Sequence, residues 1–285
     1  MSQYSYFSFV RERGQLVPNI ILSLGISLSA FALSGGEFSV PKLVISFVAL
    51  FAFILELRFM DEIKDFEKDK VAHPDRPLPR GSMTVKGIKR LILSNGILLC
   101  GIAVLVSLYS LLSGAAFAIT IIWLILMYKE FFFGEKLQQF PLVYAITHQV
   151  VIFPVIVFAV SLFGEALGLT TSMLAYGSIM FGGFFSFEVG RKLDPEAPAI
   201  LKTYLGEYGK GKTSVLIAVL LLFPLGGALL LDMFLWVLIP TIIILLVLPL
   251  ILKAPQKYES VEGVIALNLI YNSWFLFIAY LIGVL

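Results

Sequence analysis

Three aspartates recur at every fourth position near the end of an apolar run: Asp61, Asp65 and Asp69. On a helix this spacing stacks the side chains along one face, about 6 Å of rise apart, and Glu62 can join that face. Because like charges so placed repel, a bound cation would relieve them. Oxygen ligands without His or Cys favour Mg²⁺, which is usually completed by water and substrate phosphates. The alternative is a salt-bridged helix end, since three lysines are interleaved with the acids: Lys64, Lys68 and Lys70.

The residues that follow the acidic row are rich in proline and arginine. Pro74, Pro77 and Pro79 end the helix and favour an extended segment. Arg76 and Arg80 are therefore expected on a stiff stretch close to the carboxylates. Guanidinium groups suit bidentate contacts with phosphate oxygens. A carboxylate row followed by two such arginines predicts a magnesium and diphosphate site.

The composition of the chain indicates where this chemistry takes place. The 285 residues are 59% hydrophobic and only 14% charged, whereas soluble chains are roughly 45–50% apolar and about 25% charged. This excludes a cytosolic enzyme and a disordered chain, and a net charge of +2 gives no sign of a nucleic-acid partner. A single cysteine, Cys100, excludes internal disulfides and cysteine-rich metal sites. The sequence predicts an all-α, polytopic membrane protein.

Nine apolar runs are long enough to cross a bilayer, which needs about 20 residues of helix. They form a single predicted domain over residues 1–285, and breaks at Ser113-Gly114 and Asp232-Met233 indicate tight hairpins. The predicted spans are 17–34, 43–60, 91–112, 115–133, 140–163, 169–187, 214–231, 234–252 and 264–285.

The basic residues predict the orientation of these spans. With the N-terminus in the cytoplasm, 20 of the 21 Lys and Arg residues fall on the cytoplasmic side, and Lys42 is the exception. The C-terminus is then expected on the opposite side. The N-terminal residues lack the pattern of a cleaved signal peptide. Two cytoplasmic loops, 58–90 and 188–212, hold 24 of the 40 ionisable Asp, Glu, Lys and Arg side chains, so the active site is expected to face the cytoplasm.

The first of these loops resembles the aspartate-rich motif of the UbiA superfamily of intramembrane prenyltransferases. That family has Asn-Asp-x-x-Asp-x-x-x-Asp followed by an Arg-Pro-Leu-x-x-Gly tail, and this chain has the acidic row followed by Arg76-Pro77-Leu78-x-x-Gly81. Asp61 and Glu62 stand where the family has Asn and Asp, which identifies a divergent member. The resemblance implies nine helices around a central cavity, Asp61, Asp65 and Asp69 as catalytic residues, and Mg²⁺ as cofactor.

The family also carries a second Asp-x-x-x-Asp motif after its sixth helix. Glu188 takes the first acidic position here, Lys192 occupies the second, and Asp194 is the nearest acidic substitute. The resemblance implies Glu62, Glu188 and Asp194 as further metal ligands, with Arg191 and Lys192 as diphosphate contacts. An ordinary positively charged membrane anchor is the alternative interpretation of Arg191 and Lys192.

Three further residues are candidates for the same site. The family often has a basic residue at the end of its fourth helix, which implies Lys129 as a diphosphate ligand, the alternative being a lysine that extends to the membrane surface. His148 and Asn19 lie inside predicted spans and are candidates to line the cavity. An intramembrane histidine is a functional candidate, although a hydrogen-bonded core histidine is an equal alternative.

These observations predict Mg²⁺-dependent transfer of a prenyl group from an isoprenyl diphosphate to an apolar or aromatic acceptor within the lipid bilayer. A terpene cyclase of the same family would use the same donor, and a transporter or scaffold that keeps the fold is a third interpretation. Residues 206–213 match the phosphate-loop pattern G-x-x-x-x-G-K-T. That motif requires a strand before it and a helix after it, so no NTPase is expected.

Overall fold

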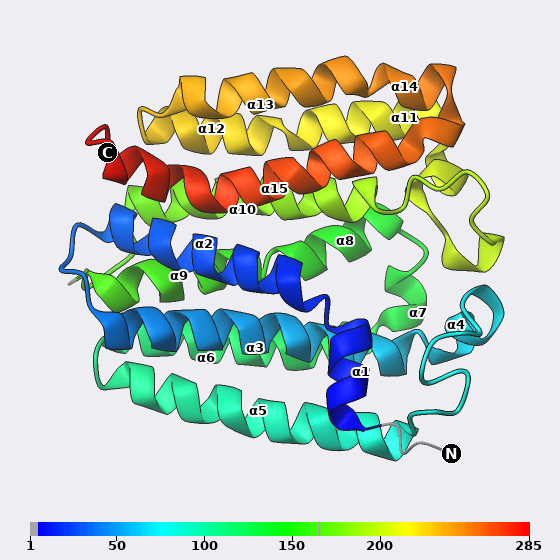
Figure 1. Cartoon of the computed structure of the whole chain (residues 1–285), viewed down its shortest axis with the longest axis horizontal. Helices are drawn as coiled ribbons and strands as arrows, with labels where there is room; N and C mark the ends of the chain where they lie inside the picture. Colours follow the sequence, from blue (N-terminus) through cyan, green and yellow to red (C-terminus); the bar gives the residue numbers. More distant parts are fainter. Residues whose placement is uncertain (1–4, 165) are drawn as a thin grey trace.

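A computed structural model describes residues 5–164 and 166–285, and within these ranges the secondary structure is helical. Short helices lie at one end of a bundle of long ones (Figure 1). The α-helices are α1 (Tyr6–Arg13), α2 (Leu16–Ser34), α3 (Val40–Lys64), α4 (Phe66–Ala72), α5 (Val85–Ser107), α6 (Leu111–Tyr128), α7 (Gly134–Leu137), α8 (Pro141–Gln149), α9 (Ile152–Phe163), α10 (Thr171–Gly190), α11 (Tyr204–Leu220), α12 (Leu222–Leu230), α13 (Phe234–Val247), α14 (Pro249–Lys253) and α15 (Tyr258–Leu281). The 3₁₀ turns are η1 (Glu130–Phe132), η2 (Ala199–Leu201) and η3 (Pro255–Lys257).

Eight helical spans in the described part of the chain are long and apolar enough to cross a membrane. Three of them consist of two consecutive helices: α8 with α9, α11 with α12, and α13 with α14. Helix α10 has 20 residues but is not among the eight, because its glycines, serines and Glu188 make it less apolar. It lies in the bundle beside the others (Figure 1), so the nine predicted spans correspond to these eight and α10.

The path of the chain agrees with an odd number of crossings, because α1 and the last residues of the chain lie at opposite ends of the bundle (Figure 1). The hairpin predicted at Asp232-Met233 is present, with Asp232 at a positive φ of 58°. The position predicted for the other hairpin, Ser113-Gly114, is wrong. Helix α5 ends at Ser107, and the side chain of Ser110 accepts a hydrogen bond from the Ser113 backbone, so that α6 begins earlier than expected.

Close helix contacts hold the bundle together at positions with small residues. At Gly182 of α10, an added Cβ would lie 2.3 Å from Cδ of Pro224 and 2.8 Å from the carbonyl oxygen of Leu220. Helix α10 therefore packs backbone against backbone on α11 and α12, as membrane helices do where small residues remove steric hindrance. The main core is formed by buried aliphatic and aromatic side chains of α2, α3, α9, α10 and α15, such as Ile26, Leu50 and Ile156.

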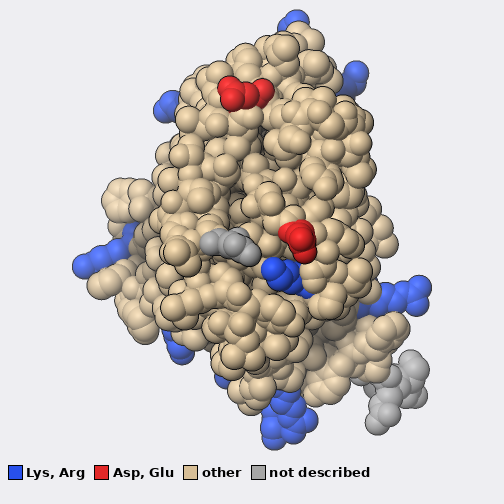
Figure 2. All heavy atoms as spheres, turned by 90° about the vertical axis from the view of Figure 1, so that its left-hand side faces the viewer, with Lys and Arg blue, Asp and Glu red and all other residues tan. Residues whose placement is uncertain are grey.

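Charge is distributed unequally between the two ends of the bundle. The loops that contain residues 58–90 and 188–212 lie at the end where α1, α4 and α7 lie (Figure 1). The opposite end presents a mostly uncharged surface, with basic side chains mainly at its margin (Figure 2). The fold therefore brings both charged loops to the same end of an apolar bundle.

Candidate functional site

The acidic row lies where α3 passes into α4. Helix α3 ends at Lys64, and Asp65 caps both α3 and α4 with φ −92° and ψ 2°. The helical hydrogen bonds continue through this bend, because Asp65 N donates to Asp61 O and Asp69 N donates to Asp65 O, both at 2.8 Å. The predicted helical row is therefore present, but a bend interrupts its straight face at Asp65.

Two of the four acids are held by arginines. Glu62 is buried and its Oε1 accepts from Nε of Arg13 at 2.5 Å. Asp69 is buried and both of its carboxylate oxygens lie 2.7 Å from Nη1 of Arg76. Asp65 forms a looser ion pair, with Lys68 Nζ 3.6 Å from Oδ1. These pairs leave Asp61 and Asp65 as the acids of the row that are not engaged by a guanidinium group in the described structure.

The proline-rich segment forms a compact turn rather than an extended stretch. Arg80 donates from Nη1 to the Asp75 carbonyl at 2.9 Å and from Nε to Ser82 Oγ at 2.7 Å. Its Nη2 also contacts Glu12 at 2.8 Å. The chain turns back after Pro79 because these nearby oxygen atoms accept hydrogen bonds from Arg80. Arg76 is held in the same segment by Asp69, so both arginines predicted as diphosphate ligands have contacts within the protein.

Helix α1 lies across this segment and was not expected to contribute to the site. Phe9 is fully buried against a cluster from α3, the following loop and the start of α5, which contains Phe59, Leu78, Met83 and Ile88. The polar residues at the end of α1, Glu12 and Arg13, then reach Arg80 and Glu62. The signal available in the sequence was a short N-terminal segment that combines aromatic residues with Arg11, Glu12 and Arg13.

The second charged segment begins where α10 ends. Glu188 accepts from Arg191 Nε at 2.6 Å and from Lys192 Nζ at 2.5 Å, so its carboxylate is bound by two cations. The Glu188 carboxylate raises the pKa of Arg191 above its usual range, and the more distant charges of Asp61 and Asp65 act in the same direction. Arg191 thus lies within electrostatic reach of both motifs.

Asp194 binds a backbone N–H group. Its Oδ1 accepts from the backbone N–H of Glu196 at 2.8 Å, which stabilises the turn before η2. The cation contacts of Glu188 and the turn contact of Asp194 give these two acids separate partners. The described residues contain no group of three or more His, Cys, Asp or Glu side chains that is arranged to hold a metal ion.

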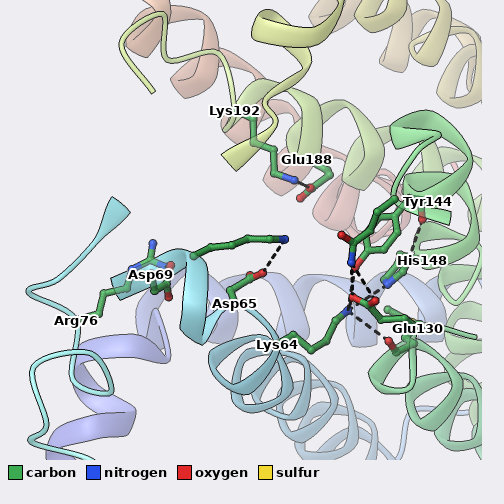
Figure 3. A network of polar contacts seen from close by, with 12 residues as sticks. Lys64, Asp65, Asp69, Arg76, Glu130, Tyr144, His148, Glu188 and Lys192 are labelled. Carbon is green, nitrogen blue, oxygen red and sulfur yellow. Dashed lines mark hydrogen bonds and ion pairs between the residues drawn. The ribbon is translucent and has the colours of Figure 1, made fainter. Parts of the chain in front are cut away.

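A third group of polar side chains lies opposite Glu188 and Lys192 (Figure 3). Lys64 of α3 donates to Tyr144 Oη at 3.0 Å and to the Met127 carbonyl at 3.3 Å, and its Nζ lies 3.5 Å from His148 Nε2. The nearest carboxylate oxygen of Glu130 is 4.0 Å from Lys64 Nζ. The rings of Tyr144 and His148 stack at 4.1 Å between centroids. Lys64, Tyr144 and Glu130 were missed by the sequence argument, although Tyr144 lies one helical turn before His148.

An open cavity of about 540 Å³ adjoins this group. Lys64 and Lys129 both line it, with the other walls formed by the end of α6, η1 and α7. Three consecutive non-glycine residues of η1 have positive φ, from 48° at Glu130 to 63° at Phe132. Such backbone conformations cost free energy and persist only where surrounding contacts hold them. The cavity wall is therefore a strained turn at the same end of the bundle as both motifs.

The remaining candidates behave differently from one another. Asn19 is buried and its Nδ2 donates to the Gly14 carbonyl at 2.6 Å, which joins α2 to the end of α1.

The phosphate-loop match lies inside helix α11, and Thr213 donates its hydroxyl hydrogen to the carbonyls of Tyr204 and Gly209. No strand precedes this helix in the described part of the chain, so the match has no phosphate-binding geometry.

Comparison with known proteins shows which family and fold the chain shares. Residues 22–272 match the UbiA prenyltransferase family. The fold is similar to the apo structure of a UbiA homolog from Aeropyrum pernix K1, with a TM-score of 0.62 and 17% identity over 92% of this chain and 96% of that one.

The fold is also similar to a structure from a study of digeranylgeranylglyceryl phosphate synthase in membranes. The TM-score is 0.59, with 17% identity over 94% of this chain and 99% of that one. No curated protein sequence shows a significant match. Since the family match covers most of the chain, this protein belongs to the UbiA prenyltransferase family.

Proposed function

We propose that this protein transfers a prenyl group from an isoprenyl diphosphate to a lipophilic acceptor within the membrane. The observation that supports this best is the convergence of two charged motifs on one end of an apolar bundle, where Arg191 is within electrostatic reach of Glu188, Asp61 and Asp65. The diphosphate group of the donor requires concentrated positive charge, and the prenyl tail of the donor requires an apolar surface beside it. The end of the bundle offers both together, facing the cytoplasm in the proposed orientation.

The cations of the site would bind and neutralise the leaving diphosphate. Arg191 and Lys192 lie together at the end of α10, and Lys129 lines the open cavity with Lys64. Fixed positive charge stabilises the negative charge that develops as the allylic C–O bond breaks. Arg76 and Arg80 have a different role in this proposal, because their contacts with Asp69 and Glu12 make them supports of the first motif.

The donor set of the first motif fits a magnesium ion. Mg²⁺ is usually held by one or two protein carboxylates together with waters and substrate phosphates, and Asp61 and Asp65 are two carboxylates one helical turn apart. These two residues would hold the ion, while Glu62, Asp69 and Glu188 stay with their cationic partners. When bound, the ion would add positive charge to the diphosphate leaving group.

Replacement of Asp65 tests the proposal. Purified protein in detergent would be incubated with radiolabelled farnesyl and geranylgeranyl diphosphate, and release of diphosphate would be measured. We expect Asp65→Ala to abolish release while the protein still elutes as a folded monodisperse species. Glu67→Ala is the matched control. Glu67 is an exposed acid of α4, the short helix that Asp65 caps, and it contacts Lys70. Near-normal turnover by Asp65→Ala would contradict the mechanism.

The same assay separates the alternatives. A terpene cyclase would release a cyclic hydrocarbon from the donor with no acceptor present, whereas a transferase needs the acceptor for its product. A transporter or scaffold would bind ligand without releasing diphosphate. Proton-coupled carriers need acid–base pairs buried away from the charged end of the bundle, and the buried Glu56 of α3 instead accepts from the neutral side chain of Asn95 at 2.8 Å. This contact favours the enzyme over the carrier.

A further inference from the structure

His148 belongs to the third polar group of the site and lies within electrostatic range of Glu188 and Lys192. It is part of α8, and its ring is stacked on Tyr144 and meets the edge of Phe131 at 5.7 Å between centroids. The charges that act on it come from Lys64 of the first motif and from Glu188 and Lys192 of the second. Figure 3 shows Glu188 and Lys192 above Lys64, with His148 to the right of them.

The contacts of the two ring nitrogens determine which of them carries the proton. Nδ1 lies 2.7 Å from the Tyr144 carbonyl oxygen, which can only accept a hydrogen bond, so Nδ1 is the donor. Nε2 lies 3.5 Å from Lys64 Nζ, which can only donate. The imidazole is therefore neutral, with its lone pair at Nε2 on the side of Lys64. A neutral histidine held by a backbone carbonyl in this way has the form of a general base.

Lys64 is placed so that it can move away from Nε2. Its side chain lines the open cavity, and its Nζ contacts neutral acceptors at 3.0 Å and 3.3 Å while the nearest Glu130 oxygen is 4.0 Å away. A diphosphate bound at the end of α3, where Lys64 is the sequence neighbour of Asp65, would attract this ammonium group. The lone pair of His148 would then face the bound substrates.

We propose that His148 is the general base of the reaction, with Lys64 and Tyr144 as the residues that position it. This inference rests on the proposed prenyl transfer. The allylic C–O bond of the donor breaks and diphosphate leaves with the electron pair. The acceptor atom forms its bond to the allylic carbon, and the proton that this atom loses passes to His148 Nε2. The imidazolium then returns the proton to the released diphosphate, which restores the neutral ring.

The test separates loss of the base from loss of the fold. Purified protein would be given geranylgeranyl diphosphate and a panel of 4-alkylphenols of graded acidity, and diphosphate release and prenylated phenol would be measured in the same samples. The variants are His148→Asn, whose amide can still donate to the Tyr144 carbonyl, and His148→Gln. The matched control is Gln149→Ala, because Gln149 is the neighbouring residue of α8 and forms no hydrogen bond with Lys64 in the described structure.

For both His148 variants we expect transfer to fall by roughly 10²- to 10⁴-fold, the usual contribution of a general base. Diphosphate release is expected to persist, with water replacing the phenol as the nucleophile, and the remaining transfer should increase with the acidity of the phenol. Gln149→Ala should behave as the unchanged protein. A parallel fall of release and transfer in the His148 variants, or transfer that stays within a few-fold, would overturn the inference.

Two results with the unchanged protein are also decisive. Diphosphate release without transfer to any phenol would overturn the assignment of His148 but leave ionisation of the donor intact. Absence of diphosphate release would instead contradict the proposed function.

Discussion

Arg13 and Glu62 lie 49 positions apart in the sequence, yet Arg13 Nε is 2.5 Å from Glu62 Oε1. Through this ion pair, the N-terminal helix α1 is joined to the first acidic motif. Glu62 is buried, and within the described residues its other oxygen, Oε2, has no hydrogen-bond partner. The carboxylate thus depends on a single cation for its compensation.

Removal of Arg13 is expected to destabilise the protein more than removal of both partners. Arg13→Met leaves a buried carboxylate without its cation, a change that typically costs about 3–5 kcal/mol. The double variant Arg13→Met/Glu62→Gln removes the charge as well and should regain most of that stability. Thermal unfolding in detergent measures both. If the double variant were as unstable as the single one, loss of the ion pair would not explain the lower stability of Arg13→Met.

Loss of the cations at the end of α10 is expected to weaken binding of the donor. Lys192→Met removes a positive charge beside the proposed diphosphate, so KM for the isoprenyl diphosphate should rise about tenfold, which corresponds to about 1.4 kcal/mol. Lys210→Met is the control, because Lys210 is an exposed lysine of the following helix. Equal KM values for the two variants would show that the position of Lys192 is unimportant.

Loss of the Lys64 contact is expected to alter the same site from the opposite side. Tyr144→Phe removes the hydroxyl that accepts from Lys64 at 3.0 Å but retains the ring stacked on His148. If Tyr144 positions Lys64, turnover should fall about three- to tenfold, since a typical hydrogen bond contributes about 0.5–1.5 kcal/mol. The folded fraction should not change. Steady-state kinetics checks this, and unchanged kcat and KM would exclude a positioning role for the hydroxyl.

Enlargement of Gly182 is expected to separate α10 from its neighbours. A methyl group there would meet Pro224 and the Leu220 carbonyl well inside van der Waals distance, so Gly182→Ala should cost about 1–3 kcal/mol as an overpacking change. Gly101→Ala in α5 has no neighbouring atom within 4 Å and should be neutral or slightly stabilising, because alanine favours helix. Thermal unfolding of the two variants in the same detergent tests the difference.

The order of helices could be predicted from the sequence because membrane helices are determined by local properties. About 20 consecutive apolar residues cross a bilayer whatever their partners are, and the nine predicted runs correspond to the eight spans and α10. The concentration of charge in two loops is equally local. The sequence alone therefore determined the membrane class, the family resemblance and the two charged segments of the candidate site.

The tertiary structure decided which charges meet. Asp69 has three lysines and three arginines within 11 residues in the sequence, but only helix bending and the turn at the prolines place Arg76 against it. Lys64 and His148 are 84 residues apart, and their contact depends on how α3 packs beside α8. Ion pairs between equivalent charged groups differ little in intrinsic energy. The packing of apolar helix faces selects among them, and that packing is a property of the whole bundle.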